Sequence, residues 1–423
     1  MMAGLKPYAA YKDSGSSWLT QVPTHWEVRA LRTLIRPRNE RNRIDLPLLS
    51  VAREKGVFVR SMTDDSENHN VIPLDLSNYK VARAGALVIN KMKAWQGSMG
   101  IAPCDGIVSP AYYVYDFGIA NGKFGQALLR SKPYVAHFGQ ASDGVRVGQW
   151  DLTIAAMRQI PVLAPPPDEQ AAIVRFLDWA NARLERTIRA KRRVIALLTE
   201  QKQAIIHRAV TRGLDPAVPF KPSGIAWLGD IPAHWEVLRA KYLYREVDER
   251  SSDGSEELLS VSHLTGITPR SHKNITMFKA VSYAGHKLCR PGDLVVNTMW
   301  AWMGALGVSG YRGVISPAYA VYRPQQPGRL VGAYMDGLLK SRPYVSNIIC
   351  RSTGLRASRL RLYPEEFFRL PIIQPPVAEQ QAIVDVIQVE TAELDTAISR
   401  LHREIDLLRE YRTRLVADVV TGK

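Results

Sequence analysis

The sequence contains one long pattern twice, and this internal duplication restricts the fold more than any other feature. Residues 18–28 read WLTQVPTHWEV, and residues 227–237 repeat them as WLGDIPAHWEV, 209 positions later. Residues 85–100 read GALVINKMKAWQGSMG and return at 292–307 as GDLVVNTMWAWMGALG. The order of such matches is kept along the chain. A repeat of about 210 residues has the size of a whole domain, which predicts a tandem duplication.

Each copy divides into a segment of mixed character and a long helix. Short β-branched runs such as ALVIN (86–90) and DLVVN (293–297) predict strands, and 125–129 and 331–339 predict short helices. A proline cluster then opens a stretch without Pro or Gly that runs to Val210, or to Val420 in the second copy. A helix of about 42 residues would be roughly 63 Å long. The predicted fold is α+β, with mixed domains at 1–165 and 213–375 and helices at 166–212 and 376–423.

Apolar residues recur along both predicted helices at alternating spacings of three and four, which is typical of a coiled-coil seam. In the second helix the seam positions are Leu394, Ile398, Leu401, Ile405 and Leu408; in the first they are Leu184, Ile188, Lys191, Ile195 and Leu198. Lys191 is the polar exception. It either sets the register of the pair or extends its ammonium group to solvent, and the second interpretation is the simpler one.

The two helices carry opposite charge. Residues 175–208 include nine basic and three acidic side chains, whereas residues 379–418 include five basic and nine acidic ones. Opposite charges beside matched apolar seams predict that the helices pair with each other, and we expect the pair to be antiparallel. The alternative is a first helix lying on a nucleic acid and a second helix with a solvated face. Pairing is favoured because it covers both apolar stripes.

Composition indicates the class of partner. The 423 residues include 56 Lys and Arg against 40 Asp and Glu, a formal net charge of +16. Such an excess is typical of proteins that bind a polyanion, most often nucleic acid, although a merely basic protein is the alternative. Three dispersed cysteines, Cys104, Cys289 and Cys350, fit neither a disulfide framework nor zinc-ligand spacing. No signal peptide or membrane-spanning run is visible, so a soluble cytoplasmic protein is expected.

The repeated motifs resemble those of a known family. They are Trp18…Pro23-x-His25-Trp26-Glu27 with its copy from Trp227, and Ser109-Pro110-Ala111-Tyr112 with Ser316-Pro317-Ala318-Tyr319. To these are added the proline-rich helix starts, with Glu169-Gln170 in one copy and Glu379-Gln380 in the other. The chain resembles the specificity subunit of a type I restriction–modification system over essentially its whole length.

This resemblance implies a division of labour. Two target-recognition domains, at 1–165 and 213–375, would each read one half of a bipartite double-stranded DNA site. The helices would fix the unread spacing and dock two modification subunits. Those partners would bind S-adenosylmethionine and methylate adenine, and restriction subunits would carry an ATP-driven motor. No cofactor is expected in this chain.

Motifs for catalysis are missing from the sequence. We find no phosphate-binding G-x-x-x-x-G-K-[ST] motif and no Asn/Asp-Pro-Pro-aromatic run. Pro167-Asp168 and Glu200-x-Lys202 imitate a nuclease pattern, but they would lie roughly 48 Å apart on one helix and could not share a metal. His25 and His234 each adjoin a tryptophan and have no acidic or Cys partner nearby in sequence, so packed structural roles are expected. The predicted catalytic, cofactor and metal residues are therefore none.

Comparison of the two copies nominates DNA-binding residues. Basic residues kept in both copies are candidates for phosphate contacts, because both modules must hold a DNA backbone. Polar residues that differ between the copies are candidates for reading bases, since Arg and Lys suit guanine and Gln suits adenine. A solvated charge is the alternative for each. The phosphate candidates are Arg146/Arg356, Arg130/Lys340 and Lys132/Arg342; the base-reading candidates are Lys91, Lys93 and Gln96, aligned with Thr298, Trp300 and Met303, and Arg359 and Arg361, aligned with Gln149 and Asp151.

Two other interpretations bear on this surface and on the whole chain. Trp95 and Trp302 occur in both copies inside apolar runs, which predicts core positions rather than base stacking. The rival functions are a duplicated RNA-binding or architectural protein and a fused methyltransferase or nuclease. The first would not be specific for a split duplex site, and the second would need a cofactor motif.

Overall fold

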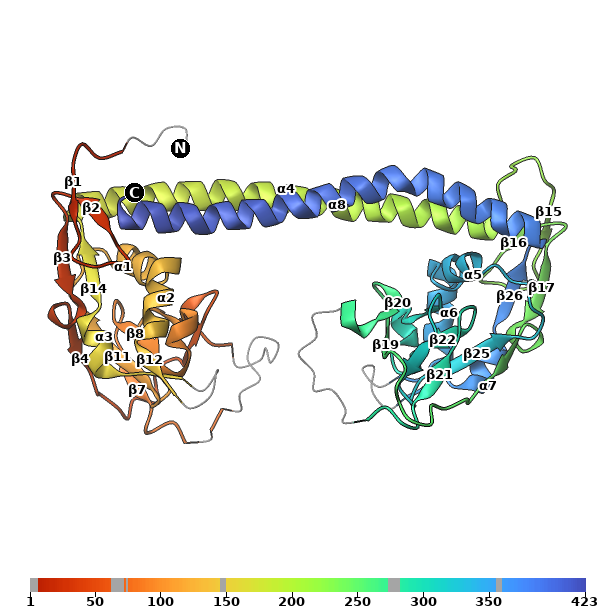
Figure 1. The fold of residues 1–423 in the computed structure, drawn as a ribbon, viewed down its shortest axis with the longest axis horizontal. Coiled ribbons are helices and arrows are strands. Elements are labelled where there is room, and N and C mark those ends of the chain that lie inside the picture. The colour runs from red at the N-terminus through yellow and green to blue at the C-terminus, as the bar shows by residue number, and fades with distance from the viewer. Residues whose placement is uncertain (1–6, 62–71, 74, 145–149, 273–281, 355–359) are drawn as a thin grey trace. The chain divides into compact units, whose positions relative to one another are not determined.

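The computed structural model describes residues 7–61, 72, 73, 75–144, 150–272, 282–354 and 360–423. The chain forms two compact units, one of residues 1–191 with 402–423 and the other of residues 192–401. Each unit therefore contains one mixed segment and parts of both long helices, α4 (Pro167–Arg212) and α8 (Val377–Thr421) (Figure 1). We call the mixed segment before α4 the first module and the mixed segment before α8 the second module.

The first module is built around a four-stranded antiparallel sheet, with the strands in the order β4 (Ile35–Pro37), β11 (Tyr112–Phe117), β8 (Leu87–Asn90) and β9 (Met99–Ile101). Its central strand β8 (Leu87–Asn90) is buried on both faces. Leu87 and Ile89 point into one apolar cluster and Val88 into another, as the twofold alternation of a strand requires. The strand run ALVIN is thus apolar throughout because both of its faces are covered.

The remaining elements of the first module cover this sheet. Helices α1 (Gly122–Leu129) and α2 (Lys132–Gln140) contribute Phe124, Leu128, Tyr134 and Phe138, all fully buried, to the larger cluster. The other helices are η1 (Leu31–Thr33), η2 (Lys91–Gln96) and α3 (Ile154–Gln159). The strands are β1 (Tyr11–Asp13), β2 (Gln21–Pro23), β3 (Glu27–Ala30), β4 (Ile35–Pro37), β5 (Leu49–Ala52), β6 (Gly56–Val59), β7 (Lys80–Ala82), β8, β9 (Met99–Ile101), β10 (Gly106–Val108), β11 (Tyr112–Phe117), β12 (Ser142–Asp143), β13 (Asp151–Leu152) and β14 (Pro161–Ala164).

The second module repeats this architecture, with a four-stranded sheet of order β18-β25-β22-β23. Its helices are η3 (Ala240–Tyr242), η4 (Arg270–His272), η5 (Ala301–Met303), α5 (Gly332–Leu339), α6 (Arg342–Arg351) and α7 (Pro364–Phe368). Its strands are β15 (Phe220–Pro222), β16 (Asp230–Pro232), β17 (Glu236–Arg239), β18 (Tyr244–Glu246), β19 (Leu259–Ser262), β20 (Gly266–Pro269), β21 (Lys287–Cys289), β22 (Leu294–Val296), β23 (Leu306–Val308), β24 (Gly313–Ile315), β25 (Ala320–Pro324) and β26 (Pro371–Gln374). The predicted tandem duplication is confirmed.

The junction between each module and its long helix is fixed by one glutamine. The Gln170 side chain donates to the carbonyl oxygen of Pro165 (2.8 Å) and accepts from the backbone N–H of Asn121 (2.9 Å). Gln380 makes the corresponding bonds to Pro375 (3.0 Å) and Val331 (2.9 Å). Both glutamines are buried. The Glu-Gln motif at each helix start therefore ties the helix to the module that precedes it.

The long helices α4 and α8 contain 46 and 45 residues and pair within each unit. In the first unit Lys191 bonds to Glu404 and Arg412 lies 3.6 Å from Glu185. In the second unit Lys202 bonds to Asp395 at 2.6 Å and Arg208 lies 4.0 Å from Glu390. Within each unit, residues later in α4 pair with residues earlier in α8. The two helices therefore pair antiparallel within each unit, as predicted (Figure 1). The alternative of an unpaired first helix is not supported.

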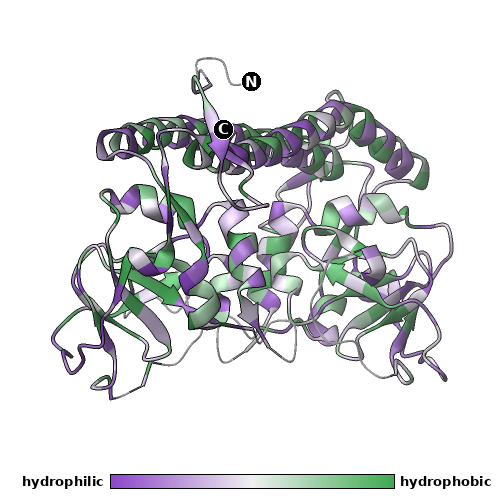
Figure 2. Cartoon of the chain, turned by 60° about the vertical axis from the view of Figure 1, so that its left-hand side comes forward, coloured by the Kyte–Doolittle hydropathy of each residue, from purple (hydrophilic) through white to green (hydrophobic). Residues whose placement is uncertain are grey.

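Two of the predicted seam positions are buried, and the other apolar ones are half-buried. Ile188 and Ile405 are buried, with 1% and 4% of their surface exposed. Figure 2 shows hydrophobic and hydrophilic residues alternating around both helices, and no helix of the described residues is apolar enough over 18 residues to cross a membrane. Lys191 does not extend into solvent as the simpler interpretation held, because its ammonium group pairs with Glu404 across the seam. The half-buried seam members are Leu184, Ile195, Leu198, Leu394, Ile398, Leu401 and Leu408.

Each module's core is completed by both long helices. In the first module the apolar cluster includes Ile173 and Leu177 from the start of α4 and Val420 from the end of α8. In the second module the cluster includes Ile383 of α8 and Val210 of α4. A module therefore does not bury its core by itself, which the sequence pattern did not predict.

Candidate nucleic-acid interface

A short 3₁₀ segment follows the central strand of each module and carries the predicted base-reading positions. In the first module this is η2, which packs against α2 and ends at Gly97 with φ of +83°. A Cβ on Gly97 would stand 3.0 Å from the Val135 side chain, so glycine suits both the backbone angle and the close packing. The equivalent segment of the second module, η5, ends at Gly304 with φ of +82°. The same local geometry thus presents different side chains in the two modules.

Lys91 is joined to a neighbouring hairpin by an ion pair. Its ammonium group donates to an Asp151 oxygen at 2.8 Å, and Asp151 lies on β13, which pairs with β12. This hydrogen bond raises the pKa of Lys91. The structure therefore brings together two positions that the sequence comparison considered separately, one from η2 and one from the hairpin.

The second module joins the same two elements with different groups. Thr353 and Arg361 form an isolated antiparallel β-bridge. The backbone N–H of Leu362, the next residue, donates to the carbonyl oxygen of Thr298 at 3.0 Å and so joins this bridge to the segment before η5. The Thr298 hydroxyl donates to the carbonyl of Ala318 at 2.9 Å. Arg361 is exposed beside it. The first module thus has a lysine and a carboxylate here, and the second has a hydroxyl and an arginine.

Tryptophan side chains occupy this surface, and the prediction that Trp95 and Trp302 are core residues is wrong. Both are half-exposed, and their indole N–H groups donate to the carbonyls of Met92 (3.1 Å) and Met299 (2.9 Å). Trp95 meets Trp150 edge to face with ring centres 5.5 Å apart. Trp300, 47% exposed, stacks on Trp302. Interleaved Lys and Gln in KMKAWQ were the available signal that this run is not a buried strand.

Two of the predicted phosphate contacts are engaged within their own modules. Arg130 donates to the carbonyl oxygens of Arg53 (2.7 Å) and Glu54 (2.9 Å), and burial lowers the pKa of its guanidinium. Lys340 donates to Asp336 at 2.9 Å. Arg130 therefore braces the turn between β5 and β6, whereas Lys340 lies close to Gly266 at the start of β20.

The other predicted DNA-binding residues are distributed as follows. Lys93 is exposed at the kink of η2, and Gln96 is half-buried beside it. Lys132 and Arg342 are exposed at the first positions of α2 and α6. Arg146, Arg356 and Arg359 lie outside the described residues.

The histidines repeated in both copies have acidic partners that sequence proximity did not reveal. His25 lies 2.8 Å from Glu169, and His234 lies 2.7 Å from Glu379, each partner being in the first turn of a long helix. Glu169 also accepts from Tyr8 (2.6 Å) and Trp26 (3.0 Å). Burial would raise the pKa of Glu169, but these three hydrogen bonds lower it overall. The cluster anchors α4 to the module, which agrees with a structural role for His25.

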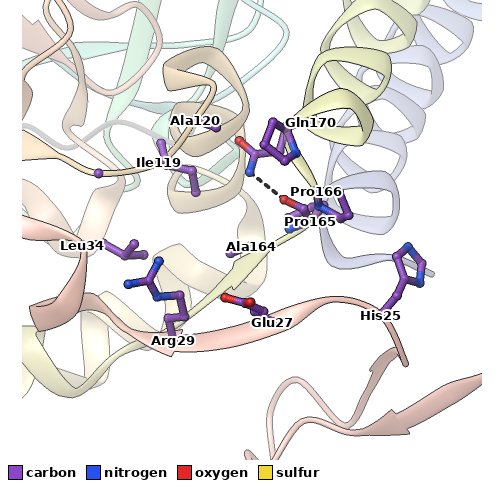
Figure 3. Close-up of a pocket in the computed structure, with 12 residues that line it drawn as sticks. His25, Glu27, Arg29, Leu34, Ile119, Ala120, Ala164, Pro165, Pro166 and Gln170 are labelled. Carbon is purple, nitrogen blue, oxygen red and sulfur yellow. Dashed lines mark hydrogen bonds between the residues drawn. The ribbon is translucent and has the colours of Figure 1, made fainter.

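A cavity of 280 Å³ adjoins this anchor (Figure 3). Glu27 and Arg29 of β3 line one side, and Pro165, Pro166 and Gln170 line the other. At the equivalent place in the second module, Arg329 approaches Glu236 (3.7 Å) and bonds to Gln374 (3.2 Å). Ile119 of the first module is equivalent to Arg329 of the second module. Each lies two residues before the residue, Asn121 or Val331, whose backbone N–H donates to the buried glutamine. The cavity is thus space that an arginine fills in the other copy.

Comparison with known proteins shows where this architecture occurs. No protein-family model and no curated protein sequence matches the chain. A solved structure described as "Structural basis underlying complex assembly and conformational transition of the type I R-M system" matches with a TM-score of 0.63 at 15% identity, covering 94% of this chain and 98% of the other. The chain has the fold of a chain from a type I restriction–modification system.

Two further structures align over similar lengths. The HsdS subunit from Thermoanaerobacter tengcongensis gives a TM-score of 0.44 at 17% identity and covers 95% of this chain and 98% of its own. The type I restriction–modification S subunit from M. genitalium gives a TM-score of 0.35 at 11% identity, with coverages of 93% and 96%.

Within the described residues, no cluster of three or more His, Cys, Asp or Glu side chains is placed to hold a metal ion.

Proposed function

We propose that this chain is the DNA-specificity subunit of a type I restriction–modification complex. Each module reads one half of a bipartite double-stranded site, and the helix pair fixes the spacing between the halves. The observation that carries this proposal is the duplicated module joined to an antiparallel helix pair, in a fold shared over 94% of the chain with a chain of such a system. The charge of +16 suits a DNA backbone.

The difference between the two modules supports a split and asymmetric site. The backbone frame around η2 and η5 is the same, whereas the side chains presented on it differ in charge and shape. Lys91 and Asp151 offer a donor and an acceptor in the first module, while Arg361, Trp300 and Met303 offer a guanidinium and apolar surface in the second. Such groups distinguish bases in the major groove. Two different half-sites are therefore expected.

The proposal assigns catalysis to partner proteins. Two modification subunits with S-adenosylmethionine, and restriction subunits with ATP, would supply the chemistry while this chain supplies recognition. Neither cofactor would bind here. The complex would work in the cytoplasm on DNA.

The test is to map methylated adenines after co-expression of the chain with its modification subunits. The expected product is a bipartite motif with two fixed halves and a constant unread gap. A continuous motif, or no motif with a demonstrably assembled complex, contradicts the proposal. Methylation or cleavage by the purified chain alone contradicts the assignment of catalysis to partners. Equal affinity for structured RNA and for the mapped duplex would favour the architectural alternative.

A further inference from the structure

An aromatic platform near the start of each module is covered in the first copy by the module's own side chain. The indole of Trp18 meets Tyr134 edge to face at 4.9 Å. His137, from α2, stacks on the same indole with ring centres 4.5 Å apart and planes inclined by 17°. The first module thus shows what this platform accommodates, namely a flat ring lying parallel to the indole.

The second module keeps the platform but lacks the ring that covers it. Trp227 meets Tyr344 edge to face at 5.0 Å, as Trp18 meets Tyr134. Asn347 occupies the position of His137 on α6. A cavity of 530 Å³ lies here, and its lining includes Trp227, His207, Arg342, Ser346, Asn347 and Cys350. Its volume is within the ordinary range of about 300–1,000 Å³ for small-molecule sites.

The polar groups of this cavity indicate the chemistry of an occupant. The Asn347 side-chain oxygen accepts from Arg351 at 2.7 Å, which leaves its amide N–H groups as donors. His207 lines the cavity beside Trp227, but its Nδ1 atom is buried without a hydrogen-bond partner among the described residues, so this nitrogen is not open to the cavity. Arg342 is exposed and has no ion-pair partner within the described part of the chain. The wall therefore combines amide donors with an exposed cation.

We propose that this cavity binds the purine ring and phosphate of a nucleotide. The base stacks on Trp227 in the place that His137 takes in the first module. Asn347 binds polar atoms on the edge of the ring, and Arg342 binds the phosphate. An aromatic side chain from a partner protein would use the platform, but it would leave the cation without a partner, so a nucleotide is favoured.

The cavity lining includes no residue of η5, although α6 also packs against η5, and the inference does not depend on the proposed function. The shared chemistry, a purine with a 5′ phosphate, occurs in free nucleotides and in unpaired nucleic-acid strands. The second module alone is expected to bind it, because His137 already covers Trp18 in the first module.

The test is titration of the full-length protein with AMP, adenosine and a short oligoadenylate. Binding is monitored through the indole NMR signal of Trp227. AMP is expected to shift this signal and to bind roughly tenfold more tightly than adenosine, because of the charge-assisted bond from Arg342. If oligoadenylate binds at Trp227 where AMP alone binds weakly, the purine is assigned to a nucleic-acid strand. Absence of any shift with all three ligands overturns the proposal.

Two variants separate the contributions. Asn347→His supplies the ring that covers the platform in the first module, so it should abolish binding of both AMP and adenosine while the melting temperature is maintained. Arg342→Ala should reduce AMP binding to the level of adenosine and leave adenosine unchanged. AMP binding by N347H equal to that of the wild type overturns the site. An aromatic peptide that shifts Trp227 where AMP does not would assign the platform to a protein partner and overturn the nucleotide.

Discussion

Single side chains fix the start of each long helix, and the two copies do this with unequal numbers of bonds. Glu169 accepts from Tyr8, His25 and Trp26, whereas Glu379 is paired with His234. In the second module the Trp235 indole N–H is buried and has no hydrogen-bond partner among the described residues. The same motif residue therefore has different energetic weight in the two copies.

Replacing each of these glutamates by alanine should expose that difference. Glu169→Ala should lower the free energy of unfolding by about 2–3 kcal/mol, and Glu379→Ala by about 1 kcal/mol, because fewer bonds are lost. The measurement is urea unfolding of both variants. Hydrogen bonds hold the pKa of Glu169 below its ordinary value of 4.5, so its contribution is present at neutral pH and is lost as the pH falls through the lowered pKa. The loss of unfolding free energy in the E169A variant should therefore become smaller between neutral pH and about pH 4. An equal loss at these two pH values contradicts this role.

Lys91 provides the sharpest test of base reading in the first module. Lys91→Met removes the donor and leaves the Asp151 carboxylate without its 2.8 Å partner. The methylated motif should change or relax in one half only, by a loss of discrimination of about 1–3 kcal/mol at one base pair. Adenine methylation mapping in a co-expressed complex measures this. Lys123→Ala, whose side chain is 76% exposed, is the matched control and should leave the motif unchanged. A change in both half-sites would contradict independent reading.

At the scale of elements, the long helices and their pairing were predictable and the module surfaces were not. A stretch without Pro or Gly and a three-four apolar spacing are local signals, so α4 and α8 begin and end close to the expected residues. The contribution of Val420 to the first core and of Val210 to the second depends on antiparallel packing over long sequence separations. Trp95 was misassigned because an apolar run does not show that its last residues turn into a 3₁₀ segment. The acidic partner of His25 lies 144 residues away, beyond any local pattern.

The helix seam can be tested with two neighbouring residues of α8. Ile405 is 4% exposed, whereas Leu407 is 57% exposed. Ile405→Ala should cost about 2–4 kcal/mol of unfolding free energy, since it removes buried methylene groups and leaves a cavity. Leu407→Ala should change stability by about 0.5 kcal/mol or less, as expected for an exposed position. Calorimetry of both variants provides the comparison, and equal losses would show that Ile405 does not face α4.

At the scale of the whole molecule, the two compact units do not coincide with the two copies of the duplication. Each compact unit takes its mixed segment from one copy and helical segments from both. An exchange of residues 20–160 with the equivalent segment of a protein of the same fold must therefore preserve the contacts made by Ile173, Leu177 and Val420. A chimera that respects these positions should fold and change one half-site, whereas one that ignores them should lose stability first.

The proposed spacing function predicts that lengthening the helix pair lengthens the unread gap. Seven residues inserted after Leu198 keep the seam in phase and add about 10 Å, or up to three base pairs at about 3.4 Å each. In α4 alone the insertion separates the pairs formed by Lys191 and Lys202, which lie on either side of it, so α8 cannot satisfy both. A matching heptad between Asp395 and Glu404 restores both pairs. The double insertion should therefore give a wider gap than the single one, with both half-sites unchanged, when methylated adenines are mapped. A fully active double insertion with the original gap would show that the helices do not set the spacing, and altered half-site bases would show that they take part in reading the sequence.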